Sequence, residues 1–168
     1  RLLYAMARFI VNKIPGVKFR LENAAGELFD RPAIITCNHQ SHFDTLCLMA
    51  LHPKVIFLTN QWAWNNPLYR SVIHHAEFIP ASDGMEAHLD ELRSLFQRGY
   101  SICIFPEGTR TVDHRIHRFH KGAFYLAEQL DADIVPVVIH GMDHVLPKND
   151  FMLREGIMTM RILKRIMS

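Results

Sequence analysis

Short apolar blocks alternate with longer amphipathic stretches along the chain, and each type of block predicts one kind of element. Residues 33–37, 55–58, 101–105 and 134–139 are short runs rich in Ile, Val and Phe. Apolar runs of this length are typical of buried strands. Further strands are expected within 17–28, at 78–79 and at 156–163.

Helices are expected between these strands. Residues 85–98 carry apolar side chains on one face of a helical projection, and Gly99 marks the end of that helix. Strands that alternate with helices indicate an α/β fold, here a single domain with a largely parallel mixed sheet flanked by helices. The other expected helices cover residues 46–51, 68–73 and 122–130.

The N-terminal residues 1–14 predict a further, amphipathic helix that ends at Pro15-Gly16. Apolar residues nearly surround its axis, with Arg8, Asn12 and Lys13 as the polar interruptions. This pattern fits a helix that lies in a membrane interface. It fits equally well a helix packed on the domain or against an upstream domain.

Composition places the chain among ordinary globular proteins. It has 168 residues, 49% hydrophobic and 21% charged, with a net charge of +2. This size predicts one domain, 1–168, and the balanced charge predicts no nucleic-acid partner. The chain starts at Arg1 and stops in mid-pattern at Ser168, so we expect a domain excised from a longer polypeptide.

The three cysteines and the absence of long apolar stretches bear on the cellular compartment. Cys37, Cys47 and Cys103 all lie in apolar runs without disulfide or metal-ligand spacing. Buried, reduced thiols are typical of a cytoplasmic protein. No apolar stretch reaches the length that crosses a bilayer.

Candidate chemistry is concentrated in the loop 38–44, between an apolar strand and a helix. His39 and Asp44 are five positions apart, so they can meet across this turn. The carboxylate then accepts the Nδ1 proton and leaves Nε2 free to take a proton from a substrate. The alternative is that Asp44 caps the following helix.

A second polar loop, 105–111, follows the strand at 101–105. Gly108 lets the backbone approach a ligand closely, Thr109 offers a hydroxyl, and Arg110 offers a planar fork for phosphate or carboxylate. Glu107 can hold Arg110 or accept a substrate hydroxyl. The alternative is a tight turn in which Glu107 and Arg110 form a solvated ion pair.

Together, Asn38-His39-x-Ser41-x-x-Asp44 and Phe105-Pro-Glu-Gly-Thr-Arg110 resemble the motifs of the glycerolipid acyltransferase family. That family contains the 1-acylglycerol-3-phosphate acyltransferases with a His-x4-Asp signature. Phe-x-Lys-Gly at 119–122 and the proline-containing strand at 135–138 are similar to its later motifs. The resemblance covers a core of residues 30–142.

The resemblance implies transfer of a fatty acyl group from a thioester, acyl-CoA or acyl carrier protein, to the hydroxyl of a lysolipid such as 1-acylglycerol-3-phosphate. His39 is then the general base, oriented by Asp44, with no metal or cofactor. Ser41 could instead act as a nucleophile, although we favour a role in bracing the turn. The expected substrate-binding residues are Asn38, Ser41, Glu107, Gly108, Thr109, Arg110 and Lys121.

One departure from the family pattern concerns the acceptor. The second motif of the family usually has an arginine just after a Phe-Ile pair, and Phe78-Ile79 is followed here by Pro80-Ala-Ser-Asp. Arg110 and Lys121 are the remaining candidates for holding a phosphate. The alternative acceptor is a non-phosphate, amino-acid-type lysolipid.

The fatty acyl and lysolipid substrates that the resemblance implies also suggest contact with a membrane, and we expect a peripheral protein on its cytoplasmic face. Trp62, Trp64, Leu68 and Tyr69 can form an interfacial or acyl-binding edge, or can pack inside the domain. The basic stretch 114–121 can face anionic lipid or the phosphates of an acyl carrier, or can be a solvated loop.

Two other classes of function compete with the acyltransferase prediction. A zinc or iron hydrolase would use His39, His42 and Asp44 with a later histidine, but their spacing fits no closed ligand pattern. A non-catalytic lipid-binding domain of a larger protein would not need a paired base and orienting carboxylate.

Overall fold

The computed structural model describes residues 2–59, 78–80, 84–111, 113, 115–148, 150 and 152–168. The strands are β1 (Val17–Glu22), β2 (Ile34–Cys37), β3 (Val55–Thr59), β4 (Ile79–Pro80), β5 (Ser101–Ile104), β6 (Ile134–His140) and β7 (Gly156–Ile162). The helices are α1 (Leu2–Lys13), α2 (Phe43–Met49), α5 (Leu89–Gln97) after a 3₁₀ turn η1 (Glu86–His88), α6 (Gly122–Leu130) and α7 (Met142–Val145).

Most of the elements expected from the hydrophobic pattern are present. The predicted helix at 85–98 begins instead as the 3₁₀ turn η1, and α2 begins three residues earlier than predicted, at Phe43. The predicted helix at 68–73 and the candidate edge from Trp62 to Tyr69 lie outside the described residues.

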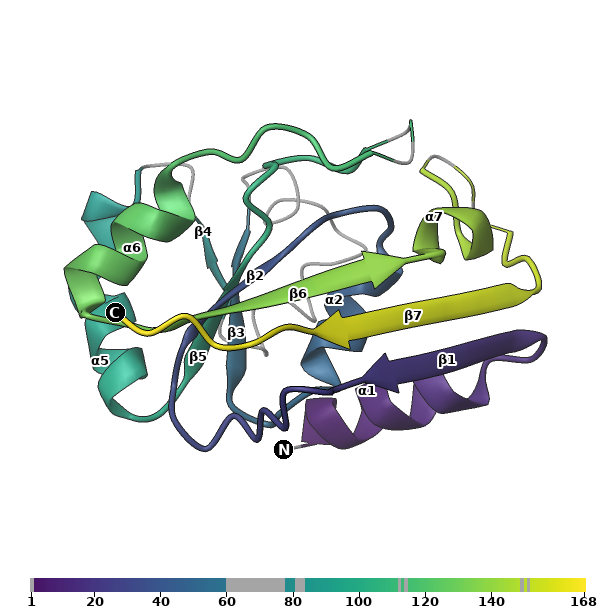
Figure 1. Ribbon diagram of the computed structural model, residues 1–168, viewed down its shortest axis with the longest axis horizontal. Helices are drawn as coiled ribbons and strands as arrows, with labels where there is room; N and C mark the ends of the chain where they lie inside the picture. The colour runs from purple at the N-terminus through teal and green to yellow at the C-terminus, as the bar shows by residue number, and fades with distance from the viewer. Residues whose placement is uncertain are drawn as a thin grey trace.

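The strands form one seven-stranded sheet with the order β1-β7-β6-β2-β5-β3-β4 (Figure 1). Every neighbouring pair is parallel except β6 and β7, which are antiparallel. The expected single α/β domain with a largely parallel mixed sheet is therefore confirmed. Because β2, β5 and β6 run the same way, the loops that follow them emerge at one edge of the sheet.

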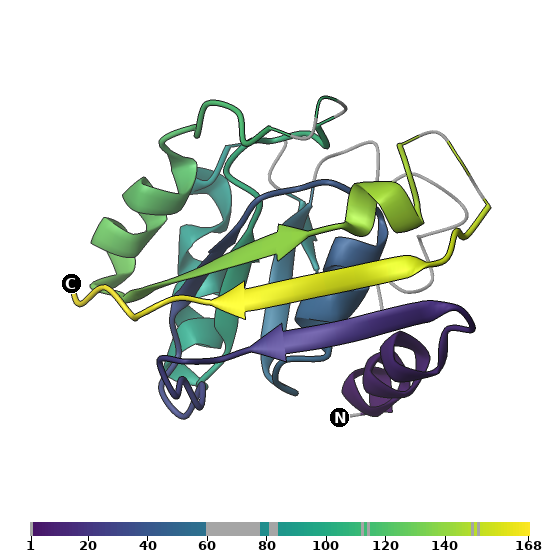
Figure 2. The same ribbon diagram turned by 45° about the vertical axis from the view of Figure 1, so that its right-hand side comes forward.

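Helices cover the two faces of this sheet and create two cores. On one face, Ala7 and Val11 of α1 and Leu48 of α2 pack over Val135 and Val137 of β6. On the other face, α5 and α6 pack over the central strands through Leu92, Leu95, Ala123, Leu126 and Ala127. Figures 1 and 2 show α1 beside β1, with α5 and α6 together at the other end of the sheet. Strands buried on both faces explain why the central runs are continuously apolar.

Helix α1 packs on the domain through only one of its sides. Ala7 and Val11 are fully buried, whereas Leu2, Met6 and Phe9 on the other side are exposed. The expectation that this helix packs on the domain is confirmed, and an exposed apolar stripe remains. No helix in the described part of the chain is long and apolar enough to cross a membrane.

A charged cluster joins the C-terminal segment after β7 to the loop before β2 and the loop before β6. The guanidinium of Arg165 donates to both carboxylate oxygens of Glu27, at 2.7 and 2.9 Å, and to Asp133 Oδ2 at 3.2 Å. Its side chain is only 9% exposed. The hydrogen bond from Arg165 is the main cause that lowers the pKa of Glu27. Bidentate pairing of this kind fixes geometry as well as charge.

Candidate active site

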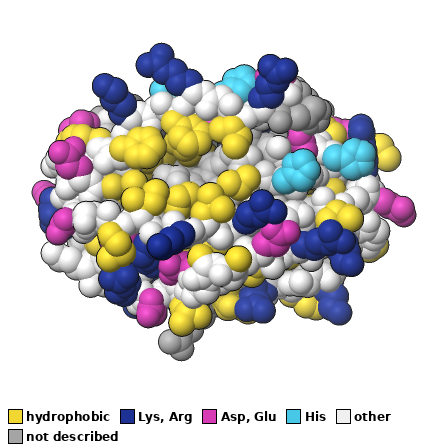
Figure 3. Space-filling view, viewed as in Figure 1, with side chains coloured by type: hydrophobic (Ala, Val, Ile, Leu, Met, Phe, Trp, Pro, Cys, Tyr) yellow, Lys and Arg dark blue, Asp and Glu magenta, His cyan; other side chains and the backbone are white. Residues whose placement is uncertain are grey.

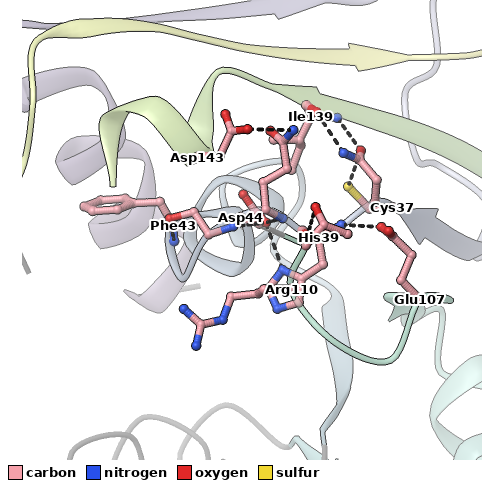
Figure 4. A network of polar contacts seen from close by, with 12 residues as sticks. Cys37, His39, Phe43, Asp44, Glu107, Arg110, Ile139 and Asp143 are labelled. Carbon is pink, nitrogen blue, oxygen red and sulfur yellow. Dashed lines mark hydrogen bonds and ion pairs between the residues drawn. The ribbon is translucent and has the colours of Figure 1, made fainter. Parts of the chain in front are cut away.

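The loop between β2 and α2 brings His39 and Asp44 together. The Nδ1 atom of His39 lies 2.8 Å from Oδ2 of Asp44 (Figure 4). The same oxygen accepts the backbone N–H groups of Gln40 at 2.6 Å and Ser41 at 2.8 Å. The expected contact across the turn is therefore present, and the turn itself positions the carboxylate.

The alternative role for Asp44, as a cap of the following helix, is wrong. The N-cap of α2 is His42, and no side-chain hydrogen bond caps this helix. The Asp44 carboxylate instead binds N–H groups of the preceding loop, and its side chain is 0% exposed. Burial raises the pKa of Asp44, while the hydrogen bonds from His39, Ser41 and Gln40 act in the opposite direction.

The ring of His39 is held on a second side by an aromatic stack. It lies 3.9 Å from the ring of Phe105, centroid to centroid, with 17° between the planes. Since Asp44 engages Nδ1, the Nε2 atom is the nitrogen left for a substrate proton. The His39 side chain remains 18% exposed, so a ligand can reach it.

The two motif loops, about sixty residues apart in the sequence, lie against each other as expected. The N–H of Thr111 donates to the carbonyl of His39 at 3.0 Å. The N–H of His39 donates to Oε1 of Glu107 at 2.9 Å. Gly108 has φ +70°, a conformation that L side chains rarely adopt, and its N–H donates to the Phe105 carbonyl within the turn.

Three of the predicted substrate-binding residues are buried and contact the main chain of the protein. The amide of Asn38 donates to the carbonyl of Ile139 and accepts its N–H, at 2.9 and 2.7 Å. The hydroxyl of Ser41 donates to the carbonyl of Leu146 at 2.8 Å, which agrees with the bracing role. Glu107 accepts two backbone N–H groups, from His39 and His117.

The other four predicted substrate-binding residues are more accessible. Gly108, Thr109 and Lys121 are exposed and Arg110 is half-buried. The backbone carbonyl of Arg110 accepts the Lys148 ammonium at 2.9 Å, which links this loop to the segment after α7. These residues line the carboxyl edge of the sheet, where ligands of open α/β folds bind.

His42 stands beside the candidate base but has a different electrostatic environment. Burial, the positive charge of Arg110 and the neighbouring His39 lower its pKa to about 4. It is therefore neutral at physiological pH. Among the described residues, no group of three or more His, Cys, Asp or Glu side chains is arranged to hold a metal ion.

Sequence reasoning missed two contributors to this site. Phe105 belongs to the motif 105–110, yet its stacking on His39 is a contact between distant segments that no local pattern shows. Gln40 was treated as a spacer, and its side chain is buried, with Nε2 3.5 Å from Asp143 of α7. The sequence carries no signal for this contact beyond the place of Gln40 between His39 and Ser41.

Comparison with known proteins finds relatives among the 1-acyl-sn-glycerol-3-phosphate acyltransferases. The chain is 30% identical over 122 residues to the chloroplastic 1-acyl-sn-glycerol-3-phosphate acyltransferase LPAT1 of Arabidopsis thaliana, covering 70% of this chain and 34% of that protein. It is 27% identical over 157 residues to human 1-acyl-sn-glycerol-3-phosphate acyltransferase beta, covering 90% and 56%. The chain thus spans about a third to a half of these relatives' length.

The fold also matches a solved structure. The 1-acyl-sn-glycerophosphate (LPA) acyltransferase PlsC of Thermotoga maritima superimposes with a TM-score of 0.80 over 98% of this chain and 67% of that one, at 20% identity. The model of the Acyltransferase family matches residues 16–140, a span that contains both motif loops and also β1. The chain belongs to the Acyltransferase family.

Proposed function

We propose that the protein is an O-acyltransferase that moves a fatty acyl group from a thioester to the hydroxyl of a lysolipid. The observation that carries this proposal is the pair formed by His39 and Asp44, with Nδ1 bound and Nε2 left for the substrate. A hydroxyl is a weak nucleophile at neutral pH, so a positioned base is needed. Membership of the Acyltransferase family supports the same reaction class.

The proposed reaction needs one base and no acyl-enzyme. Nε2 of His39 removes the proton of the acceptor hydroxyl while its oxygen attacks the thioester carbonyl. The new C–O ester bond forms, the C–S bond breaks, and the imidazolium returns the proton to the leaving thiolate. Asp44 stabilises the imidazolium and holds the ring. Ser41 is unsuited to be the nucleophile because it is fully buried and its hydroxyl donates to Leu146.

For the acceptor we propose a 1-acylglycerol-3-phosphate. The relatives compared above carry that substrate in their names. Arg110 and Lys121 supply positive charge near the two loops and are the proposed phosphate ligands, with Thr109 as an additional hydroxyl donor. The departure in the second motif, Pro80 after Phe78-Ile79, keeps a non-phosphate lysolipid as the second candidate.

We also propose that the protein works on a membrane surface. Leu2, Met6 and Phe9 form an exposed apolar stripe on α1, and Arg8 and Lys13 on the same helix are exposed too. Helices with this pattern lie in the plane of a bilayer interface.

The basic segment 115–121, which follows the loop 105–111, is a second candidate for contact with lipid and lies at the edge of the molecule opposite α1 (Figures 1 and 2). Arg115, Arg118 and Lys121 are exposed there, alternating with Ile116 and Phe119, which are 54% and 41% exposed. On the face in Figure 3, hydrophobic side chains gather around a hollow, with Lys and Arg side chains along the upper edge, where this segment runs in Figure 1. Cationic and apolar side chains together suit an anionic lipid surface.

The proposed location is the cytoplasmic face of that membrane. Cys37, Cys47 and Cys103 are all free and buried, and reduced thiols fit a reducing compartment. Burial raises the pKa of each of these thiols, so they are unreactive. Either acyl-CoA or acyl carrier protein is compatible with such a location.

The test is thiol release from a long-chain acyl thioester, offered as acyl-CoA and as acyl carrier protein, with a panel of phosphate and non-phosphate lysolipids. We expect acceptor-dependent release that falls by about 10²–10⁴-fold in His39→Ala, the usual contribution of general base catalysis. His52→Ala is the matched control, because His52 lies in the loop between α2 and β3, at the opposite edge of the sheet.

Each outcome has a distinct meaning. Release that survives the loss of His39 contradicts the mechanism. Release with non-phosphate acceptors alone replaces the proposed acceptor. Lipid binding without turnover in the wild type favours the alternative of a non-catalytic lipid-binding domain.

A further inference from the structure

Glu107 is a buried carboxylate whose two oxygens both bind backbone N–H groups. It follows β5 in the turn Pro106-Glu107-Gly108, and the residue is only 4% exposed. Oε1 accepts the N–H of His39 at 2.9 Å, and Oε2 accepts the N–H of His117 at 2.8 Å. A shielded side chain that binds the protein main chain through both oxygens is poorly placed to bind a substrate.

The first of these bonds acts on the candidate base itself. The main chain of His39 is held at its N–H by Glu107 and at its carbonyl by the N–H of Thr111. Its ring is held by Asp44 at Nδ1 and by the stack on Phe105. Asp44 fixes the rotation of the imidazole, whereas Glu107 and Thr111 fix where the residue sits (Figure 4).

The second bond reaches the segment 115–121, which follows the loop 105–111. The N–H of His117 contacts Glu107, and three residues later the N–H of His120 donates to the Pro106 carbonyl at 2.8 Å. The ring of His120 also lies over Gly108, 3.4 Å from the position a Cβ would take there. One carboxylate therefore connects two loops that are distant in sequence.

We propose that Glu107 is a positioning residue, not a substrate ligand: it sets the place of the His39 base and links that base to the segment 115–121. This inference rests on the proposed function of His39. Hydrogen bonds to an ionised acceptor are roughly twice as strong as neutral ones, so a carboxylate suits this position better than an amide. A displacement of about 1 Å at a reacting group can lower a rate by about a hundredfold.

The decisive variant is Glu107→Gln, which keeps the volume of the side chain. Its NH₂ group replaces one acceptor oxygen, so one of the two backbone N–H groups faces a donor. We expect kcat to fall about 10- to 100-fold, with KM values for thioester and lysolipid changing less than about threefold. Glu128→Gln, on the exposed side of α6, is the matched control and should behave as wild type.

Amide hydrogen exchange gives a second readout that does not need turnover. In Glu107→Gln we expect faster exchange at the amide of His39 or of His117, whichever then faces the NH₂ group, with the exchange of β5 and β6 unchanged. A merely structural defect would instead accelerate exchange across the core strands. Glu107→Asp, whose shorter side chain cannot span both N–H groups, should also speed the exchange of at least one of these two amides.

Two results would overturn the inference. One is a raised KM for the lysolipid with kcat unchanged, which would make Glu107 a substrate ligand. The other is unchanged exchange at both amides. If the wild type shows no turnover at all, the proposed function fails, while the exchange rates still decide whether Glu107 links the two loops.

Discussion

Asp44 and Glu27 are both shielded carboxylates, and their surroundings shift their pKa values in opposite directions. Glu27 receives two hydrogen bonds from the guanidinium of Arg165, which lowers its pKa. Among the described residues, the hydrogen-bond partners of Asp44 are an imidazole and two backbone N–H groups, and burial raises its pKa. The cluster around Arg165 stabilises the fold, whereas in the proposed mechanism the pair at the site keeps the Asp44 charge buried beside His39, which changes its protonation.

The largest expected effect is the loss of catalysis in Asp44→Asn. We expect activity to fall about 10²–10⁴-fold, because the neutral amide no longer stabilises the His39 imidazolium by its charge. The free energy of unfolding should change by less than about 1 kcal/mol, since the amide oxygen can still accept from Gln40 and Ser41 and no charge remains buried. Thioester turnover and urea unfolding of the same sample measure both quantities.

Arg165→Ala should show the opposite combination. Removing the guanidinium takes away the bidentate partner of Glu27 and leaves Asp133 paired with Arg31, a largely exposed side chain 3.7 Å away, and we expect a loss of about 3 kcal/mol of stability. kcat measured at a temperature where the variant is folded should equal that of wild type. Arg161→Ala is the control: its pair with Glu22 is solvent-exposed, so its loss costs about 0–1 kcal/mol. An Arg165→Ala variant as stable as this control would contradict the comparison.

The same cluster predicts a pH dependence. Because the pKa of Glu27 is lowered in the folded state, its stabilising effect is fully present above the ordinary value of about 4.3 and is lost as pH falls through the folded value. The stability difference between wild type and Arg165→Ala should therefore be constant near pH 7 and shrink below about pH 4. Unfolding curves across this range measure it, and a difference that grows on acidification would be the wrong sign.

The smallest expected effect is that of His42→Gln. His42 has a pKa of about 4 and is already neutral where the enzyme works. The acid limb of kcat/KM should therefore stay in place, with rates within about threefold of wild type. A shifted limb would show that His42 takes part in the titration that this limb reports.

Local patterns predicted the elements well because their causes are local. The run 33–37 predicted a buried strand, and β2 is buried at every position. Gly99 ends α5 with φ +83°, as its place after an amphipathic stretch indicates. Helix α7 was missed because Met142–Val145 is a single turn, too short for any periodicity to appear.

The pairing of distant strands and the long-range contacts that hold the site residues could not be predicted from local patterns. Nothing in residues 17–22 indicates that β1 lies parallel to β7, since register between distant strands depends on the whole fold. His39 and Asp44 were found because they share one loop. The contacts of Asn38 with Ile139 and of Glu107 with His39 were not, because each joins segments that only the folded sheet brings together.

The place of β1 has a consequence for how the chain is made. Residues Val17–Glu22 form an edge strand of the sheet, and their partner is Gly156–Ile162 near the other end of the sequence. During synthesis, β1 leaves the ribosome well over a hundred residues before β7. Unpaired strands of this kind invite pairing with other chains. Lys18 and Arg20 on β1 are exposed and give this edge strand positive charge. Charged side chains on edge strands oppose aggregation in natural proteins.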